Sequence, residues 1–332
     1  MSIYLDCNAT TPIEPEVVEK INHYLTKDFG NEGSHTHEYG SIAKKAVQEA
    51  RDNIGNIVEA SRNEIIFTSG ATESNNIAIL GLKDYGIENN KKHIITTAIE
   101  HKAVLEPIEE LKKIGFEVDI LPVDKSGRVN SKDIKDKLRK DTLLVSVMSV
   151  NNETGIIQPI KEISELIKDQ ECYFHVDAAQ GFGKDIETLK NKRIDLMSIS
   201  GHKIYGPKGI GALFIDKESV GRIDPIVSGG GQERALRPGT LATHQICGMA
   251  RAYEIAKEKM EDDHNHLMAC RKVFLDNCKG LKGIQINGNS EHTFPGILSI
   301  SSKGLHAESI IYDMKTIAVS KGSACTSDHE EP

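Results

Sequence analysis

The sequence lacks the features that mark membrane and secreted proteins. No stretch comes near the ~18–20 consecutive apolar residues that a membrane-spanning helix needs. The first residues show neither the charged region nor the apolar region of a signal peptide. The 6 cysteines form no Cys-x-x-Cys pair, which argues against a zinc site and against a disulfide framework. We therefore expect a soluble protein of the reducing cytoplasm with no membrane partner and no metal.

An excess of positive charge is also missing. The 41 lysines and arginines are outnumbered by 49 acidic residues, which gives a net charge of -8. Because nucleic-acid binding usually rests on a basic patch, we expect no direct binding to nucleic acid. The 332 residues contain no internal repeat and no low-complexity segment, and this length supplies ample core for one large or two moderate domains.

Short apolar segments alternate with amphipathic helical patterns along most of the chain. Residues 143–150 are almost continuously apolar, as a strand requires when its sheet is covered on both faces. The alternation predicts an α/β fold with a mostly parallel central sheet and helices on both faces. Ligands of such sheets bind beyond the carboxyl ends of the strands. The predicted strands are 65–67, 93–97, 117–121, 143–150, 172–176, 196–199 and 211–215, and the main predicted helices are 14–26, 41–60, 73–85, 103–114, 160–167 and 244–275.

One lysine stands out by its surroundings. Lys203 follows His202 and precedes the turn Tyr-Gly-Pro-Lys-Gly, after which an apolar strand begins. A lysine held in this way is not expected to be a freely solvated surface residue. It could hold an aldehyde cofactor as a Schiff base. The alternative is a phosphate-binding or purely structural lysine in a glycine-rich turn, and this segment alone does not decide between the two.

Two segments upstream supply further groups that pyridoxal phosphate requires. Asp177 ends an apolar strand, and a carboxylate against the pyridine nitrogen keeps the ring protonated and able to accept electrons. Residues 67–76, Phe-Thr-Ser-Gly-Ala-Thr-Glu-Ser-Asn-Asn, combine a strand end, small hydroxyl residues and the start of a helix. Backbone amides and the helix dipole favour a phosphate there. The three features in this order predict pyridoxal phosphate as the cofactor.

The motifs together resemble those of the group I cysteine desulfurases, the NifS- and IscS-like enzymes. These belong to the class V aminotransferase group of fold-type I pyridoxal-phosphate enzymes. The segments that carry the resemblance span nearly the whole chain: Tyr4–Pro12, Gly30–His37, Phe67–Ser74, Glu100–His101, Val150–Gly155, His175–Gln180, Ser200–Lys203, Gly229–Arg234, Arg237–Leu241 and Gly322–Ser327.

The resemblance implies a role for each candidate residue. Lys203 is expected to hold the cofactor and move a proton, and Cys325 to receive the substrate sulfur. His101 is expected to stack on the cofactor ring and assist proton transfer, the alternative being a histidine that only caps a helix. The remaining cofactor contacts implied are Asp177 to the ring nitrogen, Gln180 and Asn152 near the ring hydroxyl, Ala71, Thr72, Ser200 and His202 to the phosphate, and Thr240 to the phosphate of a neighbouring subunit in a homodimer.

Cys325 lies in a segment of small and polar residues, so we expect its thiol to be accessible and able to react as a thiolate. The other cysteines serve as a comparison. Cys172 opens an apolar strand, and Cys247, Cys270 and Cys278 fall in or near helical patterns, so all four are interpreted as structural. Cys7, in the N-terminal arm, is less clear.

The resemblance also implies how the chain is organised. A large cofactor-binding domain is expected at residues 13–246, and a small α+β domain at residues 1–12 with 247–332. The segment 228–234 is expected to be a mobile loop because it is rich in glycine. The family continues for several dozen residues beyond the point where this sequence ends, and that segment carries an arginine that clamps the substrate carboxylate. No arginine is assigned to the clamp for this reason.

The implied activity is the removal of sulfur from L-cysteine, giving L-alanine and a persulfide on Cys325. An acceptor protein would then take the sulfur for iron–sulfur assembly, transfer-RNA thiolation or DNA phosphorothioation. Cys7 and Asn8 depart from the usual family motif, in a variant associated with the DNA-phosphorothioation subgroup, and Glu32 replaces a proline that would stiffen its loop. The alternatives are a selenocysteine lyase or aminotransferase of the same fold, and a sulfur-relay scaffold that no longer turns over.

Overall fold

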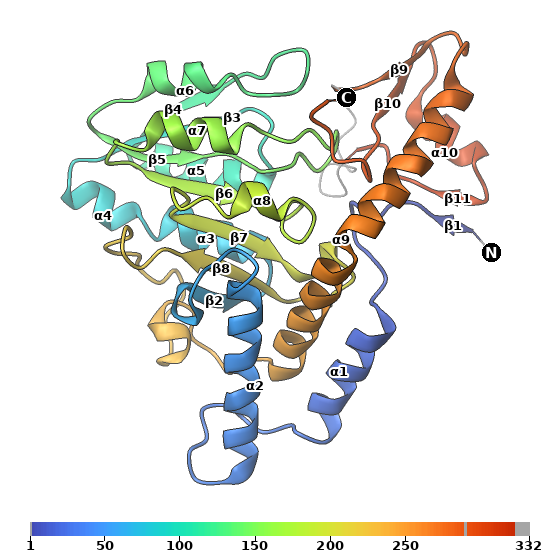
Figure 1. The fold of residues 1–332 in the computed structure, drawn as a ribbon. Coiled ribbons are helices and arrows are strands. Elements are labelled where there is room, and N and C mark those ends of the chain that lie inside the picture. The colour runs from blue at the N-terminus through green and yellow to red at the C-terminus, as the bar shows by residue number, and fades with distance from the viewer. Residues whose placement is uncertain (1, 289–290, 323–332) are drawn as a thin grey trace.

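A seven-stranded sheet forms the centre of the molecule in the computed structural model, which describes residues 2–288 and 291–322 (Figure 1). The strand order is β2-β8-β7-β6-β5-β3-β4. Neighbouring strands are parallel except for β8, which is antiparallel to β2 and β7. The predicted α/β fold with a mostly parallel sheet is therefore confirmed. The strands are β2 (Ile65–Thr68), β3 (His93–Thr97), β4 (Glu117–Leu121), β5 (Thr142–Ser146), β6 (Tyr173–Asp177), β7 (Leu196–Ser200) and β8 (Gly211–Ile215).

Both faces of the sheet are buried, which explains why its central strands are apolar throughout. Successive side chains of a strand point to opposite faces, and the structure sorts them into two separate cores. Ile94 and Leu144 pack in one core, whereas the next residues, Ile95 and Val145, pack in the other. The covering helices are α3 (Ala71–Leu80), α4 (Lys83–Glu88), α5 (Lys102–Lys113), α6 (Ser131–Lys137), α7 (Ile160–Ile167) and α8 (Ile186–Leu189).

A second region lies at the far end of the long helix α9 (Thr243–Cys278), apart from the central sheet (Figure 1). It holds the hairpin-like pair β9 (Ile284–Ile286) and β10 (Ile300–Ser302), and helix α10 (Ala307–Asp313). The N-terminal strand β1 (Ile3–Tyr4) pairs in parallel with β11 (Ile317–Ala318) in this region. We propose that it is the small domain of the expected organisation. Helices α1 (Pro15–Thr26) and α2 (Glu38–Gly55) pack against the part of α9 that lies away from this region (Figure 1).

Three expectations about single elements need correction. The segment predicted as one helix over 73–85 forms two, α3 and α4, which separate at Gly81, where an added Cβ would lie 2.4 Å from the carbonyl oxygen of Ile77. The glycine-rich segment 228–234 was expected to be a mobile loop, but its C-terminal end is fixed, because Glu233 is buried in an ion pair with Arg51. Cys270 is exposed on α9, so its interpretation as structural is wrong, whereas Cys172 and Cys247 are buried as expected.

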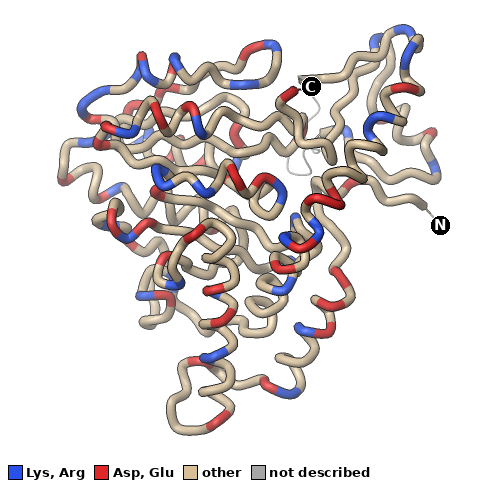
Figure 2. The backbone as a smooth tube through the Cα atoms, in the orientation of Figure 1, with Lys and Arg blue, Asp and Glu red and all other residues tan. Residues whose placement is uncertain are grey.

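Charged residues of both signs alternate along the chain rather than gathering on one element (Figure 2). Among the described residues, no helix has the length and apolar character that crossing a bilayer requires.

Candidate active site

The candidate residues gather because several parallel strands end at one edge of the sheet. Asp177 is the last residue of β6, and Ser200 is the last residue of β7. Helix α3 begins three residues after β2 ends, and Lys203 lies in the short helical turn that directly follows β7. This edge is where parallel α/β sheets bind ligands, so the fold itself brings together residues that are more than a hundred positions apart.

Asp177 is a buried carboxylate held by neutral groups. It is only 5% exposed. The Nδ2 atom of Asn75 donates to its Oδ2 at 2.8 Å, and the backbone N–H of Ala179 donates to its Oδ1 at 2.9 Å. A buried negative charge is costly unless a cation accompanies it. The site therefore suits a protonated ring nitrogen. Asn75 was not among the predicted site residues although it lies within segment 67–76, because its partner Asp177 is distant in sequence.

The start of α3 offers an open cradle for an anion. Gly70 precedes the helix with φ 153°, a conformation that favours glycine, and a Cβ there would meet no atom within 4 Å. Ala71 and Thr72 form the first turn, where backbone amides point outward and the helix dipole favours negative charge. The Thr68 and Ser74 hydroxyl groups lie 2.8 Å apart behind this turn and fix its shape. That Ala71 and Thr72 bind a phosphate stays a prediction, which the start of α3 favours.

The N-terminal arm covers Lys203. The Nζ atom of Lys203 donates to the carbonyl oxygen of Asn8 and, at 2.9 Å, to that of Ala9. Thr11 fastens the arm further, because its hydroxyl donates to the His202 carbonyl at 3.1 Å and accepts from the Tyr205 N–H at 2.8 Å. The arm motif was used for the family resemblance, but nothing in the sequence predicted this contact with the lysine.

His202 is neutral in this environment. Its Nδ1 lies 3.1 Å from the hydroxyl oxygen of Thr10. Burial, followed by the positive charges of Lys203 and Lys208, lowers the pKa of His202 to about 4. At neutral pH it can therefore offer a phosphate an N–H donor without adding charge. Ser200, also predicted for the phosphate, is buried, and its carbonyl accepts a hydrogen bond from the Tyr253 hydroxyl at 2.9 Å.

His101 caps a helix, as the alternative interpretation proposed. Its Nδ1 accepts from the backbone N–H of Ala103 at 3.0 Å, at the start of α5. This bond fixes the ring and places the proton on Nε2. A capping role and a role in the site are compatible, so stacking on the cofactor stays a prediction.

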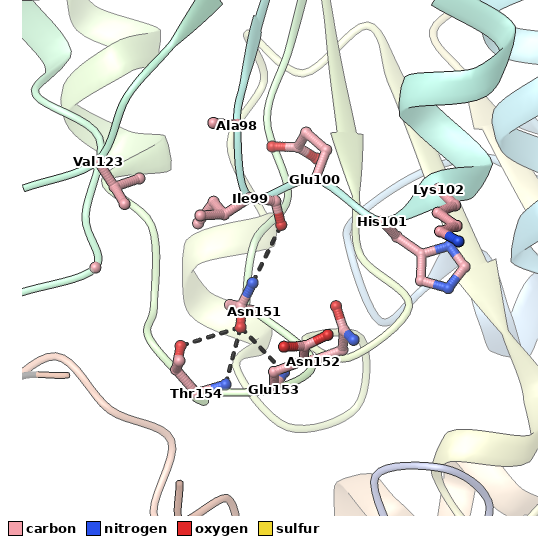
Figure 3. Close-up of a pocket in the computed structure, with 11 residues that line it drawn as sticks. Ala98, Ile99, Glu100, His101, Lys102, Val123, Asn151, Asn152, Glu153 and Thr154 are labelled. Carbon is pink, nitrogen blue, oxygen red and sulfur yellow. Dashed lines mark hydrogen bonds between the residues drawn. The ribbon is translucent and has the colours of Figure 1, made fainter. Parts of the chain in front are cut away.

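His101 and Asn152 line one pocket of about 340 Å³, together with Glu100 and Glu153 (Figure 3). The turn that carries Asn152 is shaped by its neighbour. The side-chain oxygen of Asn151 accepts from the Glu153 and Thr154 N–H groups at 3.0 and 2.8 Å. These bonds hold the turn that places Asn152 at the pocket, and Asn151 is a further residue that was not predicted.

Glu100 lies immediately before His101 and is fully buried. Its Oε1 accepts from the Thr97 hydroxyl at 2.6 Å and the Met148 N–H at 3.0 Å. Its Oε2 is buried and has no hydrogen-bond partner among the described residues. Burial raises the pKa of Glu100 to about 8, so the side chain is protonated at neutral pH.

This raised pKa predicts a pH-dependent stability. The folded protein keeps the Glu100 proton between its ordinary pKa of 4.5 and about 8, whereas the unfolded chain loses it. Stability should therefore fall as pH rises through this window, by up to about 1.4 kcal/mol per pH unit. Glu100→Gln cannot titrate, so we expect it to match the wild type near pH 5 and to exceed it by roughly 2–4 kcal/mol near pH 8. Urea unfolding at several pH values measures the difference.

The control is Glu106→Gln, which changes an exposed glutamate on α5, the helix that begins two residues after Glu100. Its stability should follow the wild type at every pH. A Glu100→Gln curve parallel to that of Glu106→Gln would contradict a buried, protonated Glu100.

Thr240 is exposed, and its segment is held close to the start of α3, where the phosphate site is predicted. The Arg237 Nε donates to the Glu73 Oε1 at 2.9 Å, and Glu73 belongs to the first turn of α3. Whether Thr240 reaches the phosphate of a second subunit stays a prediction. Cys325 lies outside the described residues.

Comparison with known proteins agrees with this geometry. The model of the family described as "Aminotransferase class-V" matches residues 3–331. The chain belongs to the class V aminotransferase family. It is 46% identical to "Cysteine desulfurase IscS" of Neisseria meningitidis, over 99% of this chain and 81% of that protein.

Solved structures place the chain among the cysteine desulfurases of this family. The structure of DndA from Streptomyces lividans is similar with a TM-score of 0.85 and 46% identity, covering 94% of this chain and 88% of that one. A structure described as "NIFS-LIKE PROTEIN" is similar with a TM-score of 0.89 and 38% identity, covering 94% and 85%. Class V aminotransferases are enzymes that depend on pyridoxal phosphate, which agrees with the cofactor predicted from Lys203, Asp177 and residues 67–76.

Proposed function

We propose that this protein is a pyridoxal-phosphate-dependent cysteine desulfurase that converts L-cysteine to L-alanine and a persulfide on Cys325. The observation that carries the proposal is the arrangement of Asp177, Lys203 and the open start of α3 at one edge of the sheet. Asp177 suits a pyridinium, and the cradle before Ala71 suits a phosphate. The names of the relatives favour this activity over a selenocysteine lyase, an aminotransferase or an inactive scaffold.

The described residues fit the cofactor. Asp177 would hold the ring nitrogen, Gln180 and Asn152 the ring oxygen, and Ala71, Thr72, Ser200 and His202 the phosphate, with Lys203 as the covalent attachment. When bound, pyridoxal phosphate stabilises negative charge at the α-carbon of the substrate. Lys203 Nζ would take the α-proton once it is free of the cofactor, and the ring of His101 would move a second proton.

The proposed transfer of sulfur from cysteine to Cys325 requires no external oxidant, because the substrate carbon is reduced as the sulfur is oxidised. The thiolate of Cys325 bonds to the sulfur of the substrate as the carbon–sulfur bond breaks. The bonding electron pair stays with the substrate carbon, which takes up a proton and becomes the methyl group of alanine. The sulfur is then carried as a persulfide, which an acceptor protein with a free thiol can take over.

The test is alanine formation from L-cysteine in the presence of dithiothreitol. We expect Cys325→Ala to reduce turnover by at least about a hundredfold, because the nucleophile that removes the sulfur is lost. Cys270→Ala is the matched control, since this cysteine is exposed on α9, and it should keep wild-type turnover. Equal rates in the Cys325 and Cys270 variants would contradict the persulfide mechanism and favour a lyase or a transaminase.

The assembly and the acceptor are part of the same proposal. We propose a cytoplasmic homodimer in which the exposed Thr240 serves the neighbouring site, and sedimentation velocity measures its mass. For the acceptor, we propose a DNA-phosphorothioation pathway, supported by the Cys7-Asn8 variant and by the likeness to DndA. Iron–sulfur assembly or transfer-RNA thiolation is the competing route, and loss of DNA phosphorothioation in a strain deleted for this gene would distinguish them.

A further inference from the structure

A second lysine shares the site with Lys203. Lys184 follows Gly183, whose φ of 85° places the chain in the left-handed region, and it lies at the end of the loop after β6. Its Nζ donates to the Gln180 Oε1 at 3.1 Å and lies 5.4 Å from the centre of the Phe294 ring. The sequence analysis assigned no role to this residue, and the proposed reaction does not use it.

Lys184 determines which way the Gln180 amide faces. An ammonium group can only donate a hydrogen bond, so the oxygen of the amide must point toward Lys184. On its other side, the Gln180 Nε2 donates to the carbonyl oxygen of Asn8 at 3.0 Å, and a carbonyl can only accept. If the amide were flipped, its nitrogen would face the Lys184 ammonium group and its oxygen would face the Asn8 carbonyl oxygen, and neither pair can form a hydrogen bond. The two partners therefore fix the orientation of the Gln180 amide.

The same carbonyl links Lys184 to the cofactor lysine. The Asn8 oxygen that accepts from Gln180 also accepts from the Lys203 Nζ. Hydrogen bonds therefore run from Lys184 through Gln180 to the arm and back to Lys203. A substitution of Lys184 can therefore shift Lys203 through this chain of hydrogen bonds.

The two ammonium groups also repel each other. Burial, and next the charge of Lys203, lower the pKa of Lys184 to about 8, with the Cys7 thiol acting in the opposite direction. Lys184 in turn adds to the positive charge around His202. Lys184 therefore places a second positive charge near both Lys203 and His202. In the described part of the chain, the titratable groups that interact electrostatically with Lys184 are Lys203, Cys7 and His202.

We propose that Lys184 is a positioning residue of the cofactor site, which turns the donor side of the Gln180 amide toward the Asn8 carbonyl that Lys203 also contacts, and which keeps a second positive charge near Lys203. This inference rests on the proposed function. It assigns Gln180 the role of donor to the ring oxygen and explains what holds it in that role.

The test compares Lys184→Met with Lys184→Arg in protein loaded with pyridoxal phosphate. Methionine keeps the length of the side chain but removes the donor and the charge, whereas arginine keeps both. The readout is the absorbance of the bound cofactor as a function of pH. Because a nearby positive charge disfavours the protonated form, its loss should raise the midpoint of this titration by about one pH unit in Lys184→Met, whereas Lys184→Arg, which stays charged above pH 8, should not raise it.

A second readout uses the cofactor-free protein. Titration with pyridoxal phosphate should give a dissociation constant about tenfold higher for Lys184→Met, as expected when one hydrogen-bonding side chain is no longer held. Lys190→Met is the matched control, because this lysine lies six residues further along and is paired on the surface with Glu187. Lys184→Gln, which is neutral but polar, replaces the methionine variant in the same comparison if that variant does not fold.

The outcomes separate the two proposals. A midpoint in Lys184→Met and Lys184→Gln equal to that of Lys190→Met would overturn the role of Lys184, even with a fully active wild type. A wild-type protein that captures no pyridoxal phosphate at Lys203 would instead overturn the proposed function.

Discussion

Lys203→Ala is expected to lose covalent capture of pyridoxal phosphate and to form alanine at least about a thousandfold more slowly than the wild type. The variant lacks both the amine that bonds to the aldehyde and the base that moves the α-proton. The two carbonyls that accept from Lys203, those of Asn8 and Ala9, would lose a donor but remain close to water at the arm. The fold should therefore survive. Borohydride reduction followed by mass spectrometry measures capture.

Lys208→Ala is the matched control for this experiment. Lys208 lies in the same turn, is exposed, and would bind a phosphate if the lysine-rich turn were only an anion site. We expect it to capture the cofactor as the wild type does. Undiminished covalent capture in Lys203→Ala would refute the central assignment and revive the phosphate-binding interpretation.

The parts of the site that follow strand ends could be predicted from the sequence. The end of an apolar segment indicates where a strand ends, and Asp177 and Ser200 are the last residues of two strands, β6 and β7. Parallel neighbours end at the same edge, so their proximity follows from the alternation of strands and helices alone. The start of α3 was predictable for the same reason, since the strand, the glycine and the helix are continuous in sequence.

Contacts between distant loops could not be predicted in this way. Periodicity describes only neighbours along the chain, whereas the arm at Asn8 reaches Lys203 across 195 positions. Asn75 and Lys184 were missed because their side chains hold Asp177 and Gln180, and no sequence pattern shows such contacts. Glu233 was missed because three glycines nearby suggest flexibility, although its carboxylate is buried against a helix.

The role of Glu233 leads to the largest expected effect on stability. Arg51 on α2 donates from Nη1 to the Ile65 carbonyl at 2.7 Å and to the Glu233 Oε2 at 2.8 Å, and from Nη2 to the Glu233 Oε1. Glu233 Oε2 also accepts from the Phe67 N–H at 2.6 Å. Both side chains are almost fully buried. The pair thus fastens the glycine-rich segment to the strand that leads into the phosphate cradle.

Glu233, Arg234 and Ala235 all have φ between 45° and 63°, a region that costs free energy in residues with a side chain. The ion pair offsets this cost by holding the segment in place. Arg51→Met would leave the Glu233 carboxylate buried without a cation, and we expect the free energy of unfolding to fall by about 3–5 kcal/mol. Urea unfolding measures the change.

Arg62→Met, Glu233→Met and one double variant decide whether the buried charge is the cause. Arg62→Met breaks an ion pair with Asp52 that is partly exposed, so it should cost at most about 1 kcal/mol. Arg51→Met combined with Glu233→Met removes both charges and should recover a large part of the loss, because a well-packed apolar pair can replace a buried ion pair. If the double variant were as unstable as the sum of its single variants, the lost stability would come from packing and from the bonds to Ile65 and Phe67.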